Sequence, residues 1–202
     1  MSTAALGRLE RIELRRAWIS EGGDFTPWLA QEENLSLVSA LLGLDLQLVA
    51  TEKNVGTFRA DLLCKDTLTN TNVIIENQLE WTDHSHLGQL LTYAAGLRAT
   101  TVVWIARKFT AEHRATLDWL NEITSRDVNF FGLEIELWSI GESAMAPKFN
   151  VISQPNDWAK RVATSLEQPG SITDLGQFYE MYWAKFKGYL DEYSTIIKAR
   201  RP

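Results

Sequence analysis

A polar stretch at residues 66–72, between two aliphatic runs, constrains the fold of this chain more than any other feature. The stretch is rich in threonine and asparagine, and the runs that flank it, 58–63 and 73–79, are rich in leucine, isoleucine and valine. Turn-forming residues between two such runs predict a β-hairpin. A turn centred between Leu68 and Thr69 places Asp61 directly opposite Glu76 on the two paired strands.

Side-chain alternation predicts the neighbours of these two acids. Residues two apart on a strand share a face, so Arg59 and Leu63 are expected beside Asp61. On the second strand, Gln78 is expected beside Glu76. Like charges opposed on a sheet repel each other, and a buried pair needs either a cation or a raised pKa. Mg²⁺, which prefers carboxylate oxygens and keeps several waters, is the simplest such cation.

A plainer interpretation of the same residues stays open at this point. The strand face could be solvated and carry two unrelated acids. A hairpin whose register slips by one residue would also turn every side chain to the opposite face.

The acids and their neighbours resemble the PD-(D/E)XK nuclease superfamily, which has the restriction-endonuclease-like fold. In that family an acid on one strand and an acid-x-lysine pair on the next hold magnesium. Asp61 matches the first acid and Glu76 the second, with Gln78 in the lysine position. The resemblance implies that these three residues are catalytic. It also implies that Asp61, Glu76 and the main-chain carbonyl of Asn77 bind Mg²⁺, for which Mn²⁺ is a substitute.

Two further features carry this resemblance. The pair Gln89 and Tyr93, four residues apart on an expected helix, looks like an element of the RecB-type exonucleases. The resemblance implies that both bind substrate. Arg59, a basic residue near the acids, is a further candidate for substrate binding. The run from Phe25 to Asp157 also looks like an uncharacterised bacterial family of the superfamily, whose members usually continue into a further domain.

The family often takes another acid from a helix that precedes these strands. Here Thr26 and Pro27 form a helix-start signal, and Gly43 marks the end. Within the helix Glu33 interrupts an apolar stripe of residues four apart, and is therefore expected to face inward as a further metal ligand. Glu32 fits almost as well. The stripe consists of Leu29, Leu37 and Leu41.

The glutamine in the lysine position leaves two functional hypotheses open. Gln78 is neutral and cannot exchange a proton at ordinary pH, unlike a lysine. The first hypothesis is a metal-dependent nuclease that hydrolyses DNA to leave a 5′-phosphate, in defence against foreign DNA or in DNA repair. The alternative is a catalytically inactive domain that serves as a nucleic-acid-binding or assembly module. RNA stays open as a substrate.

Periodicity predicts the rest of an α/β fold: a restriction-endonuclease-like core with a mixed central sheet, in which helices flank an antiparallel three-stranded meander. Residues 9–18 fit a strand or a helix equally. Besides the hairpin runs, strands are expected at 44–51, 101–106, 133–140 and, as an edge, 148–153. Helices are expected at 86–97, with Asp83 as N-cap, and at 112–124.

The character of the chain changes near residue 155. We therefore expect a nuclease-like domain at 1–154 and a helical appendage at 155–202, or a linker to a missing domain or dimer partner. A long helix at 173–198 carries an aromatic side. Packing against the first domain, a homodimer contact and a docking site for a downstream domain all fit it.

Composition limits these hypotheses. Of the 202 residues, 45% are hydrophobic and 23% charged, which is typical of a globular protein. No apolar run reaches the ~18 residues of a membrane span, and no signal peptide is evident, so a cytoplasmic location without a membrane partner is expected. The net charge of −6 argues against non-specific coating of nucleic acid. Basic residues are then expected only in a substrate cleft.

The cysteine and the histidines suggest no other chemistry. Cys64, the single cysteine, is expected to be a buried structural thiol. His84 and His86 follow Glu76 by one loop and could bind a metal or contact phosphate, but their spacing fits no standard zinc pattern. Helix-start or surface positions suit them better. His113 is expected at an exposed helix start, as a structural or solvated residue.

Overall fold

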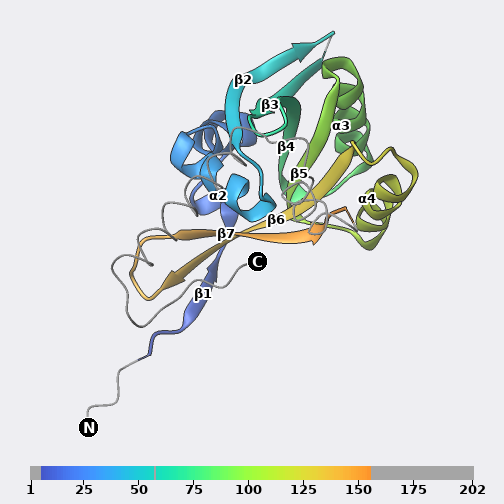
Figure 1. The fold of residues 1–202 in the computed structure, drawn as a ribbon. Helices are drawn as coiled ribbons and strands as arrows, with labels where there is room; N and C mark the ends of the chain where they lie inside the picture. Colours follow the sequence, from blue (N-terminus) through green and yellow to red (C-terminus); the bar gives the residue numbers. More distant parts are fainter. Residues whose placement is uncertain (1–5, 57, 156–202) are drawn as a thin grey trace, which may run out of the picture. The chain divides into compact units, whose positions relative to one another are not determined.

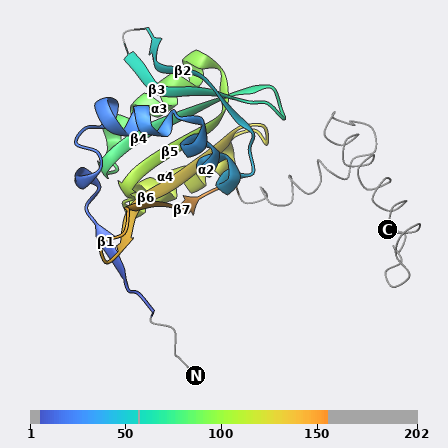
Figure 2. The same ribbon diagram turned by 90° about the vertical axis from the view of Figure 1, so that its left-hand side faces the viewer.

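A computed structural model describes residues 6–155 except Thr57. Seven strands form one mixed sheet in the order β1-β6-β5-β4-β3-β2, and β7 also pairs with β6. Figure 1 shows α3 and α4 on one side of the sheet and α2 on the other. Seen from the side, β2 and β3 lie at the opposite edge of the sheet from β1 (Figure 2). The predicted α/β class with a mixed sheet is confirmed.

The elements follow one another in an order close to the predicted one. Two short turns of helix precede α1: a 3₁₀ turn (Leu14–Arg16) and a π turn (Glu21–Phe25). The helices are α1 (Thr26–Leu29), α2 (Glu32–Leu42), α3 (His84–Leu97) and α4 (Ala111–Ile123). The strands are β1 (Leu9–Ile12), β2 (Leu46–Val55), β3 (Phe58–Asp66), β4 (Thr71–Trp81), β5 (Ala99–Lys108), β6 (Asn129–Ile140) and β7 (Ala146–Ser153).

The predicted hairpin is β3 and β4, in the predicted register. Leu62 lies opposite Ile75, and the antiparallel pairing continues to the turn. Asn70 adopts a left-handed conformation there, with φ of 59°, which asparagine tolerates better than most residues. The pairing of β3 with β4 extends from the turn to Leu62, which is adjacent to Asp61. The hairpin therefore opens at the first of the two acids.

Parallel pairing begins on the other side of β4. Strands β4 and β5 are parallel, and so are β5 and β6, because α3 and α4 carry the chain back between them. The core between these helices and the sheet includes Leu63, Tyr93, Trp104 and Leu117. The strand-helix-strand crossover predicted from periodicity is confirmed. It brings the N-terminus of α3 next to the end of β4.

The helix predicted from Thr26 to Gly43 differs in its start. The helical path begins at Glu21 with the π turn and breaks between α1 and α2, so Thr26 is not an N-cap. Its side chain is 1% exposed, and its hydroxyl accepts a hydrogen bond from the Asn77 amide instead. Gly43 ends α2 as predicted, with φ of 64°.

Other boundaries changed less. Residues 9–18, left undecided, contain β1 and then the 3₁₀ turn. Asp83 is the N-cap of α3, as predicted, and accepts from the N–H of His86. His113 is 4% exposed, so the expectation of an exposed helix start was wrong. Apart from Pro155, the predicted appendage at 155–202, including 173–198, lies outside the described residues. None of the helices within residues 6–155 is both long and apolar enough to cross a membrane.

Two glycines provide a matched test of this packing. A Cβ at Gly132 of β6 would lie 3.0 Å from Leu117 and 3.1 Å from Phe109, whereas a Cβ at Gly88 of α3 would meet nothing within 4 Å. We expect Gly132→Ala to destabilise the protein by about 1–3 kcal/mol through overpacking. Gly88→Ala should stabilise it by roughly 0.5–1 kcal/mol, because alanine favours a helix interior. Urea unfolding of both variants measures this, and equal effects would contradict the packing of α4 on β6.

Candidate active site

The site begins where β3 leaves β4. The backbone N–H of Asn77 donates to Oδ2 of Asp61 at 2.7 Å. In a regular antiparallel ladder that N–H would donate to a carbonyl of the neighbouring strand. The Asp61 carboxylate thus replaces a backbone acceptor, and this hydrogen bond holds it against β4.

A second carboxylate, that of Glu21, accepts a hydrogen bond at the same edge of β4. Oε1 of Glu21, in the π turn, accepts from the backbone N–H of Leu79 at 2.8 Å. Residues 77 and 79 point their N–H groups to the same side of the strand. Asp61 and Glu21 therefore cap two successive donors that β3 leaves unpaired. No pattern in the sequence marks Glu21, because the helix-start signal lies downstream of it, at Thr26.

Glu76 precedes the first of these two donors and is 4% exposed. The backbone N–H of Asp61 hydrogen-bonds to its carboxylate, so each acid is bonded to the other strand. Among the described residues, Oε2 of Glu76 and Oε1 of Gln78 are buried without a hydrogen-bond partner. Buried oxygens of this kind usually bind a proton donor, a water or a cation.

The electrostatics follow from this burial. Burial raises the pKa of Asp61 from 3.8 to about 6, although the Asn77 N–H acts to lower it. Burial, and then the charge of Asp61, raise the pKa of Glu76 from 4.5 to about 9. The charges of Glu52 and Glu21 raise both values further. A cation between the acids would reverse these shifts, because it favours both ionised forms.

Glu52 brings a fourth carboxylate toward the site from β2. It falls between the pairs Thr51–Leu62 and Lys53–Ala60, which places it opposite Asp61. Its φ is 49°, a left-handed conformation that marks an irregular strand at this point. Arg59, expected to face substrate, contacts Oε2 of Glu52 at 3.6 Å, with 64% of its side chain exposed.

Gln78 is held by the end of β4 and by the residue before α3. Its Nε2 donates to the carbonyl of Trp81 and to Oδ2 of Asp83, both at 2.7 Å. An amide NH₂ has two donors, so both are used. Gln78 therefore offers the site only an acceptor oxygen, where the resembled family has a cation.

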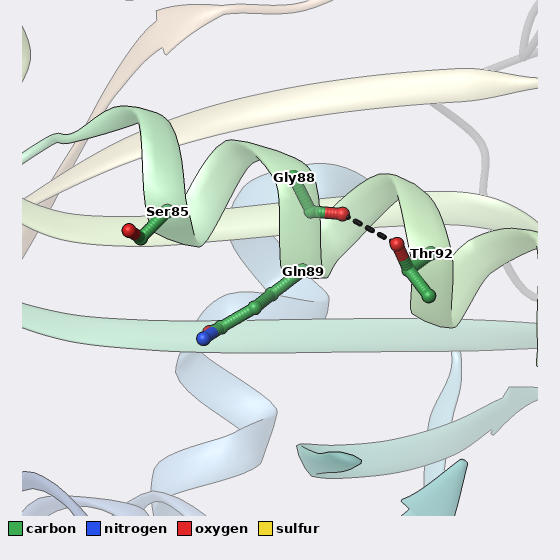
Figure 3. Close-up of a pocket in the computed structure, with 4 residues that line it drawn as sticks. All are labelled: Ser85, Gly88, Gln89 and Thr92. Carbon is green, nitrogen blue, oxygen red and sulfur yellow. Dashed lines mark hydrogen bonds between the residues drawn. The ribbon is translucent and has the colours of Figure 1, made fainter. Parts of the chain in front are cut away.

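The two expected substrate-binding residues of α3 have different surroundings. Tyr93 is 2% exposed, and burial, then the charges of Glu76 and Asp61, raise its pKa. The structure thus brings Tyr93 beside the two acids but under the surface. Gln89 is half-buried and lines a surface pocket of about 340 Å³ with Ser85, Gly88 and Thr92. Figure 3 shows its side chain extending from the helix, while the Thr92 hydroxyl turns back to the Gly88 carbonyl.

Glu33 does not face inward, and this expectation was wrong. The buried residues of α2 are Leu35, Val38 and Leu42, so Glu33 lies on the exposed side with Leu37 and Leu41. The reason is the break between α1 and α2, which shifts the phase of the helix between Leu29 and Glu33. Glu33 lines a shallow acidic surface pocket with Gln31, Glu32 and Ser36.

The donor set suits a hard cation that keeps most of its waters. Within the part of the chain that the structure describes, no three acid, histidine or cysteine side chains are close enough to hold a metal. Two carboxylates with the orphaned Oε2 of Glu76 nevertheless fit Mg²⁺, which commonly binds one or two carboxylates and several waters. Asp61, Glu76 and a main-chain oxygen of β4 are the atoms able to hold it.

His84, His113 and Cys64 have structural roles around the site. Nδ1 of His84 lies 2.7 Å from Nε2 of His113, whose Nδ1 contacts the hydroxyls of Thr82 and Thr110. This network ties the N-terminus of α3 to that of α4. Cys64 is buried, and burial raises its pKa to about 12, which makes it an inert thiol as expected.

Comparison with known proteins adds little at the sequence level. No family model and no curated protein matches the chain. Among solved structures, it resembles a repair endonuclease from Pyrococcus abyssi over 45% of this chain and 42% of that one, at 16% identity and a TM-score of 0.37. It resembles EndoMS in a complex with double-stranded DNA over 52% of this chain and 45% of that one, at 17% identity and a TM-score of 0.36.

A further likeness is to the type IIG restriction endonuclease BpuSI, at 16% identity and a TM-score of 0.25, over 61% of this chain and 12% of that one. The chain thus spans less than half the length of each of these three proteins. Because all three TM-scores are below 0.5, the function has to be argued from the residues of this chain.

The raised pKa values make stability depend on pH. Metal-free folded protein keeps protons that the unfolded chain releases above about pH 4–5, so stability is highest below that pH. It falls as pH rises through about 6 for Asp61 and about 9 for Glu76. At pH 9, we expect Glu76→Gln to raise the Tm of metal-free protein by more than about 4 °C. The exposed Glu142→Gln is the control, and a Glu76→Gln Tm equal to wild type across this range would contradict the burial of the pair.

Proposed function

We propose that the chain is a metal-dependent nuclease of the PD-(D/E)XK superfamily that hydrolyses phosphodiester bonds of DNA. The observation that carries the proposal is the Asp61–Glu76 pair: a half-buried and a buried acid on adjacent strands, each bonded to the backbone of the other strand, with one oxygen of Glu76 lacking a partner among the described residues. Burial of two like charges costs free energy unless a cation compensates them. A purely structural role would be served as well by neutral side chains.

The roles follow from position. Asp61 and Glu76 bind Mg²⁺, or Mn²⁺ in its place, through their carboxylates. The carbonyl of Asn77 joins them, because N–H and C=O of one strand residue point the same way and its N–H already meets Asp61. When bound, the metal lowers the pKa of a water and neutralises charge on the phosphate.

The other residues act around this centre. Gln78, through its free Oε1, accepts a hydrogen bond from the attacking water and so orients it. Tyr93 fixes the positions of β3 and the acids, since its hydroxyl bonds to the backbone of Arg59. Gln89 contacts the DNA strand from the open side of α3. Arg59 contributes positive charge at the edge of the site, where it also forms an ion pair with Glu52.

One observation favours the alternative, a binding or assembly module that does not cut. Both donors of Gln78 are used within the protein, and no cation occupies the lysine position. Other basic residues at strand ends are also paired: Arg107 with Glu13, and Lys108 with Glu134, each at 2.9 Å. A module would keep the fold and its contacts without turnover. A role in defence or repair, and DNA rather than RNA as substrate, belong to the same proposal.

A cleavage assay separates the two functions. The purified protein is incubated with linear and supercoiled DNA, and with RNA, in the presence of Mg²⁺ or Mn²⁺. We expect DNA cleavage that falls by more than about 100-fold in Asp61→Asn and in Glu76→Gln, because each removes a metal ligand. Glu142→Gln is the matched control. No cleavage of any substrate, together with no metal-induced rise in Tm, would support the module.

A second pair of variants tests which further acid supports the metal. Glu21→Gln keeps an oxygen for the Leu79 N–H but removes a charge that acts on both site acids. We expect it to weaken Mg²⁺ binding about threefold to tenfold by calorimetric titration. Glu33→Gln, on the exposed side of α2, should leave the affinity unchanged. Weaker Mg²⁺ binding in Glu33→Gln but not in Glu21→Gln would instead support Glu33, the metal ligand expected from the sequence.

A further inference from the structure

The proposed hydrolysis lacks a proton acceptor. Attack by water on a phosphodiester requires that the water lose a proton, and Gln78 cannot take one. Glu76 and Asp61 are committed to the metal in the proposed function. Some other group at the edge of the site is therefore needed if the chain is to cut DNA at an appreciable rate.

His86 is held in place for this task by Asp83. Nδ1 of His86 lies 2.9 Å from Oδ2 of Asp83, and its backbone N–H donates to Oδ1 of the same carboxylate, also at 2.9 Å. The same Oδ2 accepts from Gln78 at 2.7 Å. One carboxylate thus connects the residue in the lysine position with the imidazole on the first turn of α3.

The hydrogen bonds determine which ring nitrogen is free. An ionised carboxylate can only accept, so Nδ1 of His86 must carry the proton that it donates to Asp83. Burial acts to raise the pKa of Asp83, but the hydrogen bonds and charge of His86 outweigh it and the pKa is lowered, so the carboxylate stays ionised. In the neutral imidazole, Nε2 then has the lone pair. No hydrogen bond to Nε2 is formed by the described residues.

His86 also lies on the side of α3 that faces the acids. His86 and Tyr93 are seven residues apart, which places them on one helix face, and Tyr93 lies beside the acids. The charge of His86 lowers the pKa of Asp61, so the ring of His86 acts electrostatically on the site. Its side chain is 24% exposed, which leaves room for a water or a phosphate. The charged groups that face it are Asp83 on its own turn and, at the site, Asp61 with Glu76, Glu52 and Glu21.

We propose that His86, oriented by Asp83, is the general base of this site and takes the role that the lysine has in the resembled family. The inference rests on the proposed nuclease function. As the water oxygen attacks phosphorus, Nε2 accepts one of its protons, and the electron pair of that O–H bond stays on the oxygen that forms the new P–O bond. The P–O3′ bond breaks, and its electron pair goes to the 3′ oxygen, which takes a proton from solvent. His86 later returns its proton to solvent.

The first test is kinetic and uses the full chain with Mg²⁺ and linear DNA. We expect His86→Gln to lower kcat by about 100-fold or more, with KM changed less than about threefold. The rise of wild-type kcat with pH on the acid side should be absent from the variant. His84→Gln, the neighbouring histidine that contacts His113 instead, is the matched control and should keep the wild-type profile.

The second test needs neither metal nor turnover. Nitrogen NMR of metal-free protein labelled at histidine, assigned with His86→Gln, reports which ring nitrogen is protonated in the neutral form. We expect His86 to be protonated at Nδ1, whereas free histidine prefers Nε2. Asp83→Ala should return it to the Nε2-protonated form and lower kcat by about tenfold or more. His86 protonated at Nε2 in wild type would overturn the inference.

The outcomes separate this inference from the function on which it rests. If DNA is cut and the cleavage is lost in Asp61→Asn but not in His86→Gln, the nuclease function stands and the inference falls. If His86→Gln also abolishes the Mg²⁺-induced rise in Tm, the residue is a metal ligand and the inference falls again. If wild-type protein cuts neither DNA nor RNA, both fall together.

Discussion

The hydrogen bond from the Asn77 N–H to the Asp61 carboxylate is the interaction on which the site depends. It replaces a backbone hydrogen bond between β3 and β4, so the two strands separate at Asp61 without leaving the N–H of Asn77 unpaired. Because β3 leaves β4 there, Glu21 can accept a hydrogen bond from the backbone N–H of Leu79, while Glu76 stays buried. Fold and site are therefore coupled, because the acids that make the site also complete the edge of β4.

That arrangement concentrates negative charge where water is scarce. The charge of Asp61 raises the pKa of Glu76, and the charges of Glu21 and Glu52, from two other elements, raise the pKa of both acids. In the absence of a cation the site holds protons, and a divalent ion would replace them. Under the proposed function, competition between protons and metal at these acids would let a chain with a net charge of −6 act on a polyanionic substrate, because the metal, rather than a basic surface, would provide the local positive charge.

Sequence reasoning was most successful where a strong local pattern determines structure. The turn at 66–72 fixed the register of Asp61 and Glu76, and the crossover through α3 followed from periodicity. It failed where tertiary contacts decide. Thr26 looks like an N-cap, but its hydroxyl is used by Asn77, and the resulting break in the helix turns Glu33 to solvent. Glu21 was missed for the same reason, because its partner, the N–H of Leu79, is distant in the chain. His86 was expected at a helix start or on the surface, since its bonds to Asp83 depend on the geometry of a cap and are not visible as spacing.

A crystal of the protein soaked with Mn²⁺ and measured for anomalous scattering tests the central claim most directly. The account predicts one strong anomalous peak within about 2.0–2.3 Å of a carboxylate oxygen of Asp61 and of Glu76, with the Asn77 carbonyl on the same side. A peak elsewhere, or no peak at Asp61 and Glu76 at neutral pH, would contradict it.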